Sequence, residues 1–472
     1  DKNGVEIYKY GGDYNDYDAS DNNFNCNGII GPDRVLNPHA YEIAYYHQNI
    51  WAQPIDLKAG KISVHNEFFF RDLSNYKLVW SLLKNGNAVQ KGEIDRLDVA
   101  PQQTVELTLP YKMGEVCPHA EVMLNVDFVL KSAEPLLAAG TRMAYNQFEV
   151  QQGACFRKMA KAPEKVTKDL KLKLTDNKAT NNVTVSNAHF TVTFDKTTGL
   201  LKAYEVDGNS LLGTEGTLKP NFWRAVTDND MGAGINKKYK AWFHPRMELT
   251  TFTSAYNKKA NTAKVNATFQ MPDVMASLIL NYDIQANGTI KVTQEMRTTP
   301  EAKVSDMFRF GMVMQLPYDM DRSVFYGRGP VENYADRKLS QNVGVYKQTA
   351  DEQFYPYIRP QETGTKSDIR WWKQENQNGF GFRILSNELF SASALHYSID
   401  DLNDGDEKEQ RHSPQVPKSK YTELCIDQLQ AGVGGVNSWN SDARALPQYR
   451  VGYKDRSFTF YLIPTIKKDE KK

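Results

Sequence analysis

Two short segments combine amide, aromatic and glycine residues in a pattern that can bind a small polar ligand. In the run 23–28 (NFNCNG), amide oxygens and free backbone carbonyls can bind a hard monovalent cation or the hydroxyls of a sugar. In the run 432–439 (GVGGVNSW), glycines allow the backbone to come close to another group, and Trp439 presents a flat aromatic face. Because asparagine- and glycine-rich loops are also common in plain turns, a purely structural role remains the alternative for both segments.

Other patterns that carry chemistry are incomplete or absent from the sequence. The run 228–230 (DND) resembles half of a calcium loop but lacks the remaining ligand positions and the distal glutamate, which favours a hydrogen-bonded turn. There is no P-loop, GxSxG, HExxH or dinucleotide fingerprint. Glycoside cleavage needs two carboxylates about 5 to 9 Å apart, and no acidic residue follows a segment that reads as a barrel strand. The four cysteines are too widely spaced to predict a zinc site or a disulfide framework.

Composition excludes several classes of partner. The 58 basic and 57 acidic residues give a net charge of +1, so there is no electrostatic case for nucleic acid or an anionic membrane. No apolar run approaches the roughly 20 residues that a bilayer span requires. The sequence therefore predicts a soluble globular protein, and it leaves open whether the compartment is cytoplasmic or periplasmic.

The elements that must position these segments are mostly strands. Residues 1–49 are irregular and polar apart from one short helix, for which Asn37 is the expected N-cap and Pro38 the first-turn proline. Residues 50–150 alternate apolar and polar side chains, with an Asn85-Gly86 hairpin turn, and predict an immunoglobulin-like β-sandwich. Residues 151–180 are rich in lysine and are interpreted as a linker. Residues 181–470 resume short strands without a long helix, which predicts one large antiparallel sandwich.

Several motifs, in the same order along the chain, resemble those of the large bacterial β-galactosidases of glycoside hydrolase family two. Residues 10–13, 24–28, 33–34 and 38 look like the last loop and helix of that family's catalytic (β/α)8 barrel. The motifs that look like the family's C-terminal sandwich are 221–225 (NFWRA), 228–230, 232, 327–337 (GRGPVENYADR), 360–364 (PQETG) and 432–439. The resemblance covers essentially the whole chain.

The resemblance implies an architecture and a set of roles. The architecture is the remnant of a barrel, an immunoglobulin-like domain and a super-sandwich of the galactose-mutarotase-like type. The backbone carbonyl of Phe24 and the side chain of Asn27 match sodium ligands that help hold the galactosyl 6-hydroxyl. Trp439 matches the aromatic platform for the aglycone, and Glu362, which matches a segment near the active-site entrance, is expected to contact the substrate. Val436 and Asn437 stand where acidic residues are common in the family, which leaves the aglycone preference open.

The resemblance also implies what the chain does not contribute. In this family the acid/base and nucleophile glutamates, and the magnesium ligands beside them, lie in the barrel, at positions before residue 1 of this sequence. No glutamate of the chain matches either motif, so we expect no catalytic residue here. The chain is therefore expected to be the C-terminal part of a retaining β-galactosidase that is inactive alone, with a β-galactoside and the missing N-terminal domains as partners and homo-oligomerisation left open.

Two other functions remain as alternatives. The first is a free-standing, non-catalytic carbohydrate-binding protein built on sandwich domains. The second is a mutarotase-like enzyme, which needs a histidine acid and a carboxylate base. His244 and His396 lie in the large predicted sandwich, but no motif in the sequence pairs either of them with a carboxylate.

Overall fold

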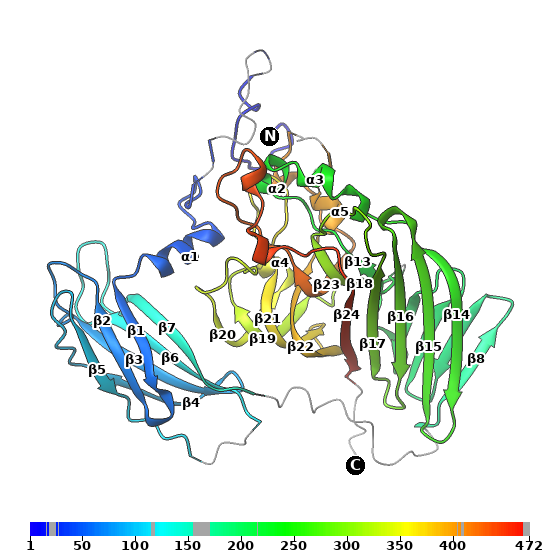
Figure 1. The fold of residues 1–472 in the computed structure, drawn as a ribbon, viewed down its shortest axis with the longest axis horizontal. Coiled ribbons are helices and arrows are strands. Elements are labelled where there is room, and N and C mark those ends of the chain that lie inside the picture. Colours follow the sequence, from blue (N-terminus) through cyan, green and yellow to red (C-terminus); the bar gives the residue numbers. More distant parts are fainter. Residues whose placement is uncertain are drawn as a thin grey trace.

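The computed structural model of the 472-residue chain shows two β-rich lobes, with an N-terminal segment lying against the larger one (Figure 1). It describes residues 1–15, 17, 25–26, 28–114, 119–153, 170–214, 216–403, 405–406 and 410–465. The longest helix in these ranges is α1 (Pro38–Tyr46), which lies between the two lobes. No helix in the described ranges is long and apolar enough to cross a membrane.

The smaller lobe consists of two antiparallel sheets packed on one core. One sheet has the order β4-β3-β6-β7 and the other β1-β2-β5. The strands are β1 (Ile50–Asp56), β2 (Lys61–Asn66), β3 (Tyr76–Lys84), β4 (Asn87–Ile94), β5 (Thr104–Thr108), β6 (Val122–Leu130) and β7 (Arg142–Gln151). Seven strands in two facing sheets confirm the immunoglobulin-like sandwich that the alternation of side chains predicted.

The hairpin between β3 and β4 forms at the predicted turn. Asn85 and Gly86 both have positive φ, of 48° and 82°, as a two-residue type I′ turn requires. Leu78, Trp80 and Leu82 point from β3 into the core, while the residues between them are half-buried. The period-two pattern of the sequence therefore sets which face of the strand is buried.

The larger lobe holds a 12-stranded antiparallel sheet and a five-stranded antiparallel sheet. The main path of the large sheet runs β13-β18-β23-β22-β24-β17-β16-β15-β14, and β19, β20 and β21 extend from β22; the small sheet runs β12-β11-β10-β9-β8. Both sheets contribute to one core, in which the rings of Phe194 and Tyr282 meet edge to face at 4.9 Å. These sheets confirm the prediction of a mostly β fold with one large antiparallel sandwich.

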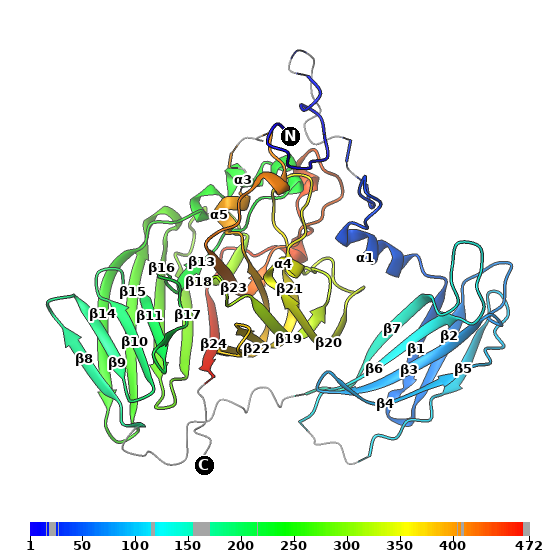
Figure 2. The same ribbon diagram turned by 180° about the vertical axis from the view of Figure 1, so that it is seen from behind.

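The elements of the larger lobe are as follows. The small sheet contains β8 (Lys173–Asn177), β9 (Asn182–Ser186), β10 (Phe190–Asp195), β11 (Leu201–Val206) and β12 (Asn209–Ser210). The large sheet contains β13 (Lys219–Asn221), β14 (Glu248–Asn257), β15 (Thr262–Met271), β16 (Ala276–Ile284), β17 (Ile290–Thr298), β18 (Arg309–Pro317), β19 (Arg322–Gly329), β20 (Asn342–Thr349), β21 (Lys366–Glu375), β22 (Gly381–Leu395), β23 (Tyr421–Gln430) and β24 (Arg456–Pro464). The short helices are α2 (Asp228–Gly232), α3 (Ile235–Lys238), α4 (Ala350–Gln353) and α5 (Ile399–Leu402). Seen from behind, α3 and α5 lie at the upper end of the large sheet, below the N-terminal segment (Figure 2).

Strand β8 lies inside the range 151–180 that was predicted to be a linker. It pairs with β9, and Leu172 just before it is buried in the core of the larger lobe. Lysines alternate with Leu172 and Leu174, and their charges hide a strand that buries one face. The interpretation of residues 170–180 as linker is therefore wrong, and residues 154–169 of the predicted range lie outside the described residues.

The predicted helix forms at Pro38, but its N-cap is made differently from the prediction. Asn37 has the extended backbone of an N-cap residue, yet its side chain caps no helix nitrogen. Its amide group donates to Gly28 O at 2.5 Å, and its oxygen accepts a hydrogen bond from the Tyr355 hydroxyl. Asn37 thus joins the N-terminal segment to a loop of the larger lobe, because tertiary partners compete for the same side chain.

Candidate functional site

An open cavity of about 950 Å³ lies where loops of the larger lobe meet the N-terminal segment. Five separate parts of the chain form its walls. One of them includes α2, which is drawn just below the N-terminus in Figure 1. The lining residues include Gly28, His39, Asp228, Asn229, Glu332, Glu362 and Trp439. Described residues from all three segments that stand out in the sequence, 23–28, 228–230 and 432–439, therefore border one cavity.

Trp439 stands at the edge of this cavity with 78% of its surface exposed. The side-chain oxygen of Asn437 accepts hydrogen bonds from the backbone nitrogens of Trp439 and Asn440, at 3.1 and 3.4 Å. From α2, Asn229 accepts a hydrogen bond from the Ser438 hydroxyl at 3.1 Å. Neighbouring polar groups thus fix the backbone that carries the tryptophan, while its ring is free to contact a ligand.

The glycines of the run 432–439 allow close packing within the protein. The carboxylate of Asp336 accepts hydrogen bonds from the backbone nitrogens of Val433 and Gly434, at 3.1 and 2.8 Å. A Cβ atom on Gly432 would lie 2.3 Å from Asp336 Oδ2. The group that the backbone approaches is therefore the Asp336 carboxylate, and these glycines support the site by holding the loop in place.

The acidic run 228–230 starts a short helix. Thr227 caps α2 in a reciprocal box with Asp230, and Asp230 is buried against Arg224 with an Oδ1 to Nη2 distance of 2.7 Å. A Cβ atom on Gly232, the last residue of α2, would lie 2.1 Å from Ser438 O. The run therefore positions the Trp439 loop, and it forms a hydrogen-bonded turn of helix as the sequence favoured.

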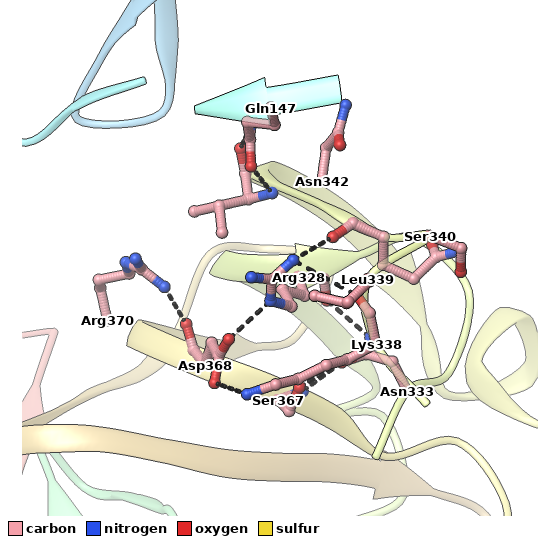
Figure 3. Close-up of polar contacts among 12 residues, drawn as sticks. Gln147, Arg328, Asn333, Lys338, Leu339, Ser340, Asn342, Ser367, Asp368 and Arg370 are labelled. Atoms are coloured by element: carbon pink, nitrogen blue, oxygen red, sulfur yellow. Dashed lines mark hydrogen bonds and ion pairs between the residues drawn. The ribbon is translucent and has the colours of Figure 1, made fainter. Parts of the chain in front are cut away.

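Loop 330–341 forms another wall of the cavity, and polar contacts at both of its ends fix it (Figure 3). Asp368 accepts from Arg328 Nε at 2.6 Å and from Lys338 Nζ at 2.9 Å. The side chain of Asn333 donates to Arg328 O at 3.1 Å. Burial alone would raise the pKa of Asp368, but the charges of Lys338 and Arg328 hold it below the usual value. A charged, fully bonded cluster thus anchors the loop.

The smaller lobe also contacts the strands that flank loop 330–341. The side chain of Gln147 on β7 bonds to both backbone groups of Val343, with distances of 2.7 and 2.8 Å (Figure 3). Arg370 on β21 donates to Glu121 from Nη2 at 2.7 Å, and both side chains are 5% exposed. The hydroxyl of Tyr326 also donates to Glu121. A buried ionic contact therefore joins the immunoglobulin-like lobe to the strands that carry loop 330–341.

Arginine neutralises each of three carboxylates on the cavity wall. The pairs are Asp228 with Arg359 at 2.6 Å, Glu332 with Arg337, and Glu362 with Arg309 at 2.6 Å. Glu332 accepts further hydrogen bonds from Tyr357, Thr363 and the backbone of Gly364. The wall is polar and carries little uncompensated charge, which suits a neutral ligand rich in hydroxyl groups.

Glu362, which was predicted to bind the substrate, lies on this wall. The residue is buried, with only 5% of its surface exposed. One carboxylate oxygen pairs with Arg309, and the other accepts a hydrogen bond from the Thr365 hydroxyl at 2.8 Å. Contact with a substrate stays a prediction for this residue. Its described bonds fix the bend between the 360–364 segment and β21.

The two residues expected to bind sodium, Phe24 and Asn27, lie outside the described residues. Their described neighbours Cys26 and Gly28 border the cavity. Within the ranges given above, no group of three or more His, Cys, Asp or Glu side chains is placed to hold a metal ion. Sodium prefers neutral oxygen ligands, which clustering of His, Cys, Asp and Glu side chains does not test. The sodium site therefore stays a prediction from the resemblance.

The structure also brings residues to the site that the sequence did not single out. His39 on α1 lines the cavity, and burial together with the charge of Arg337 lowers its pKa. A neutral imidazole can both donate to and accept from a hydroxyl group. Tyr357 lines the wall beside Glu332. One feature of the sequence could have pointed to His39: it directly follows Pro38, in the first turn of the predicted helix. That turn packs on a cluster of loops.

Two family models match the chain. One, described as the β-galactosidase small chain, matches residues 186–462, and the other, described as β-galactosidase domain 4, matches residues 62–151. A β-galactosidase of Priestia megaterium is 32% identical over 459 residues, covering 97% of this chain and 42% of the relative. A β-galactosidase of Pseudoalteromonas haloplanktis is 27% identical over 487 residues, covering 98% of this chain and 44% of that relative. The chain thus spans less than half of the length of these curated relatives.

Among solved structures, a galactose 1-epimerase from Lactobacillus acidophilus aligns with 62% of this chain and 98% of its own. The TM-score is 0.34 and the sequence identity is 9%. A TM-score of this size supports no conclusion about function. The matches in sequence, by contrast, extend over both lobes.

Proposed function

This chain belongs to the β-galactosidase family, and we propose that it forms the C-terminal part of a β-galactosidase that hydrolyses terminal β-D-galactosyl residues. In this proposal the cavity beside Trp439 is the aglycone side of the active site. One observation carries the proposal: an exposed tryptophan, held by a rigid loop, borders a large cavity whose charged groups are internally paired. The family match supplies the substrate class.

Each part of the cavity has a role in the proposal. The face of Trp439 stacks on the apolar face of the aglycone, because aromatic rings bind such faces without needing a hydrogen-bond partner. His39 and the paired side chains around it offer donors and acceptors to sugar hydroxyls. The near-neutral wall matches an uncharged ligand, since each carboxylate is already held by an arginine.

The catalytic carboxylates come, in this proposal, from a barrel that lies outside this chain. A retaining glycosidase uses one carboxylate to attack the anomeric carbon and another to protonate the departing oxygen. Glu332 accepts hydrogen bonds from four groups and Glu362 from three, and each is paired with an arginine, which suits a structural role in the cavity wall. The residues of this chain bind and orient the substrate, and the chain alone is inactive.

The metal ions of the proposal have separate locations. The carbonyl of Phe24 and the side chain of Asn27 would hold sodium, which would supply a positive charge beside the galactosyl 6-hydroxyl. Magnesium is held by residues of the barrel. Gly28, which follows Asn27, is held in place through its carbonyl, which accepts a hydrogen bond from Asn37.

A non-catalytic carbohydrate-binding protein is the alternative, and a cavity with five wall segments from this one chain favours it. Measurements of galactoside binding and of galactoside hydrolysis distinguish the two functions. Calorimetry with phenyl β-D-galactoside tests whether the chain binds a galactoside, and Trp439→Ala tests whether binding uses this cavity. Phe70→Ala is the matched control, because Phe70 is a fully exposed aromatic residue of the smaller lobe.

Hydrolysis is tested in a chimera, in which this chain replaces the matching region of the Priestia megaterium relative. We expect the chimera to hydrolyse the aryl galactoside. Trp439→Ala is expected to raise its KM about threefold to tenfold, because stacking is lost while the catalytic step is untouched. An inactive chimera that folds, combined with tight galactoside binding by the chain alone, would favour the binding protein.

A further inference from the structure

A second cavity, of about 240 Å³, opens at the end of the large sheet between β13, β18 and β23. It shares no described lining residue with the cavity beside Trp439. Its size is near the lower end of the range for ligand pockets. The cavity can therefore hold a molecule of about one sugar ring, and no extended chain of sugars.

Asn221 on β13 lines this cavity and carries a buried donor without a partner among the described residues. The residue is 8% exposed, and its side-chain oxygen accepts a hydrogen bond from Trp223 N at 3.1 Å. Its amide nitrogen is buried and bonds to no group within the described chain. A buried donor without a partner costs free energy, and a ligand oxygen in the cavity would supply the missing partner.

Glu423 on β23 presents an acceptor to the same cavity. The residue is 7% exposed, and its Oε1 accepts a hydrogen bond from the backbone nitrogen of Ile399 at 2.7 Å. Within the described residues we find no hydrogen bond to Oε2. Burial raises the pKa of Glu423 to about 7, although the Ile399 nitrogen and Lys219 oppose the rise and Asp400 and Asp401 add to it.

His244 and Asp400 form the rim. Nε2 of His244 lies 3.0 Å from Oδ1 and 3.1 Å from Oδ2 of Asp400, so the structure provides the histidine–carboxylate pair that the sequence did not reveal. The φ of His244 is +50°, a conformation that is uncommon for residues other than glycine and asparagine. The packed rings of Trp223 and Phe243, with centroids 5.2 Å apart, form an apolar wall.

We propose that this cavity is a second binding site, which takes a small uncharged polyol the size of one sugar ring through Asn221, Glu423 and the aromatic wall. Hydroxyl groups can accept from the free amide nitrogen and donate to the free carboxylate oxygen. The apolar wall matches the C–H face of such a ring. Asp400 is paired with His244, and Lys219 lines the same cavity as Glu423, so the wall offers little uncompensated charge and a neutral ligand fits it best.

Calorimetry and saturation-transfer NMR with D-glucose and myo-inositol test the proposal on the whole chain. Asn221→Asp is the sharpest variant, because it keeps an acceptor for Trp223 N and replaces the donor with a second acceptor. His244→Asn changes the exposed rim, and asparagine tolerates the positive φ, so it serves if the first variant fails to fold. Trp439→Ala reports on the other cavity, and Phe70→Ala, which changes an exposed aromatic residue of the smaller lobe, is the matched control.

We expect saturable binding of at least one probe at one site per chain. Asn221→Asp is expected to weaken that binding at least about fivefold and His244→Asn about threefold, whereas Phe70→Ala leaves it within error. The proposal is overturned if neither probe binds saturably, or if Trp439→Ala abolishes binding that Asn221→Asp and His244→Asn leave intact. Tighter binding of glucosamine or glucuronate than of D-glucose would contradict the assignment of a neutral ligand.

Discussion

Oδ2 of Asp336 lies 2.8 Å from the backbone nitrogen of Gly434, although the two residues are 98 positions apart in the sequence. This contact ties loop 330–341 to the loop that carries Trp439. Both loops border the large cavity. The position of the exposed tryptophan therefore depends on a carboxylate that itself needs no contact with a ligand.

Removal of this anchor is expected to reduce galactoside binding without unfolding the protein. Asp336→Ala leaves the nitrogens of Val433 and Gly434 without their partner, so the Trp439 loop loosens. We expect a loss of affinity similar to that of Trp439→Ala and a loss of stability near 1 kcal/mol. Calorimetry and acrylamide quenching of tryptophan fluorescence measure both effects. Asp442→Ala, an exposed carboxylate of the same loop, is expected to change neither.

A methyl group at position 232, at the end of α2, is also expected to displace the Trp439 loop. In Gly232→Ala the new Cβ would lie 2.1 Å from Ser438 O, a backbone atom that must move. Alanine favours the helix itself by up to about 1 kcal/mol, so stability alone does not predict the effect. We expect weaker galactoside binding at an almost unchanged melting temperature. Gly452→Ala, where the nearest atom is 3.7 Å away, is the control.

The buried pair of Glu121 and Arg370 is expected to hold the two lobes together. Glu121→Ala leaves Arg370 as an uncompensated buried charge, which costs about 3 to 5 kcal/mol. In calorimetry the variant should unfold at a lower temperature, with the lobes separating into two transitions. Glu93→Ala removes an exposed pair with Lys77 and is expected to cost less than about 1 kcal/mol. Equal effects of the two variants would contradict the role of the buried pair.

Glu423 is expected to make stability fall as the pH rises from about 4.5 to 7. Burial raises its pKa to about 7, so the folded state binds the proton more tightly than the unfolded state does. The stabilisation is complete below the pKa of the unfolded state and is lost as the pH passes the folded value, a change of roughly 3 kcal/mol. Urea unfolding of Glu423→Gln should show a flatter pH profile in this window. Glu106→Gln, on the exposed face of β5, should leave the profile unchanged.

Local patterns in the sequence predicted the local parts of the fold. Asn85 and Gly86 form their hairpin because both can adopt positive φ, and the alternation in β3 marks its buried face. Strand β8 escaped prediction because the neighbouring lysines obscured the buried Leu172 and the half-buried Leu174. In each case the outcome depends on a few neighbouring residues, which is why a single sequence is informative.

The site itself combines local and distant determinants. The motif 432–439 identified Trp439, whose exposure follows from its own loop. The anchoring role of Asp336, the pairing of Glu121 with Arg370 over 249 positions, and the meeting of His244 with Asp400 depend on which strands become neighbours. No spacing in one sequence encodes such contacts.

Hydrolysis of an aryl β-D-galactoside by the purified chain tests the central claim most directly. The protein is prepared from a host without β-galactosidase, and the same substrate is given to the chimera with the Priestia megaterium relative. We predict a rate equal to that of buffer for the chain alone and clear turnover for the chimera. Turnover by the chain alone that Glu332→Gln or Glu362→Gln abolishes would contradict the claim that this chain contributes binding groups and no catalytic residue.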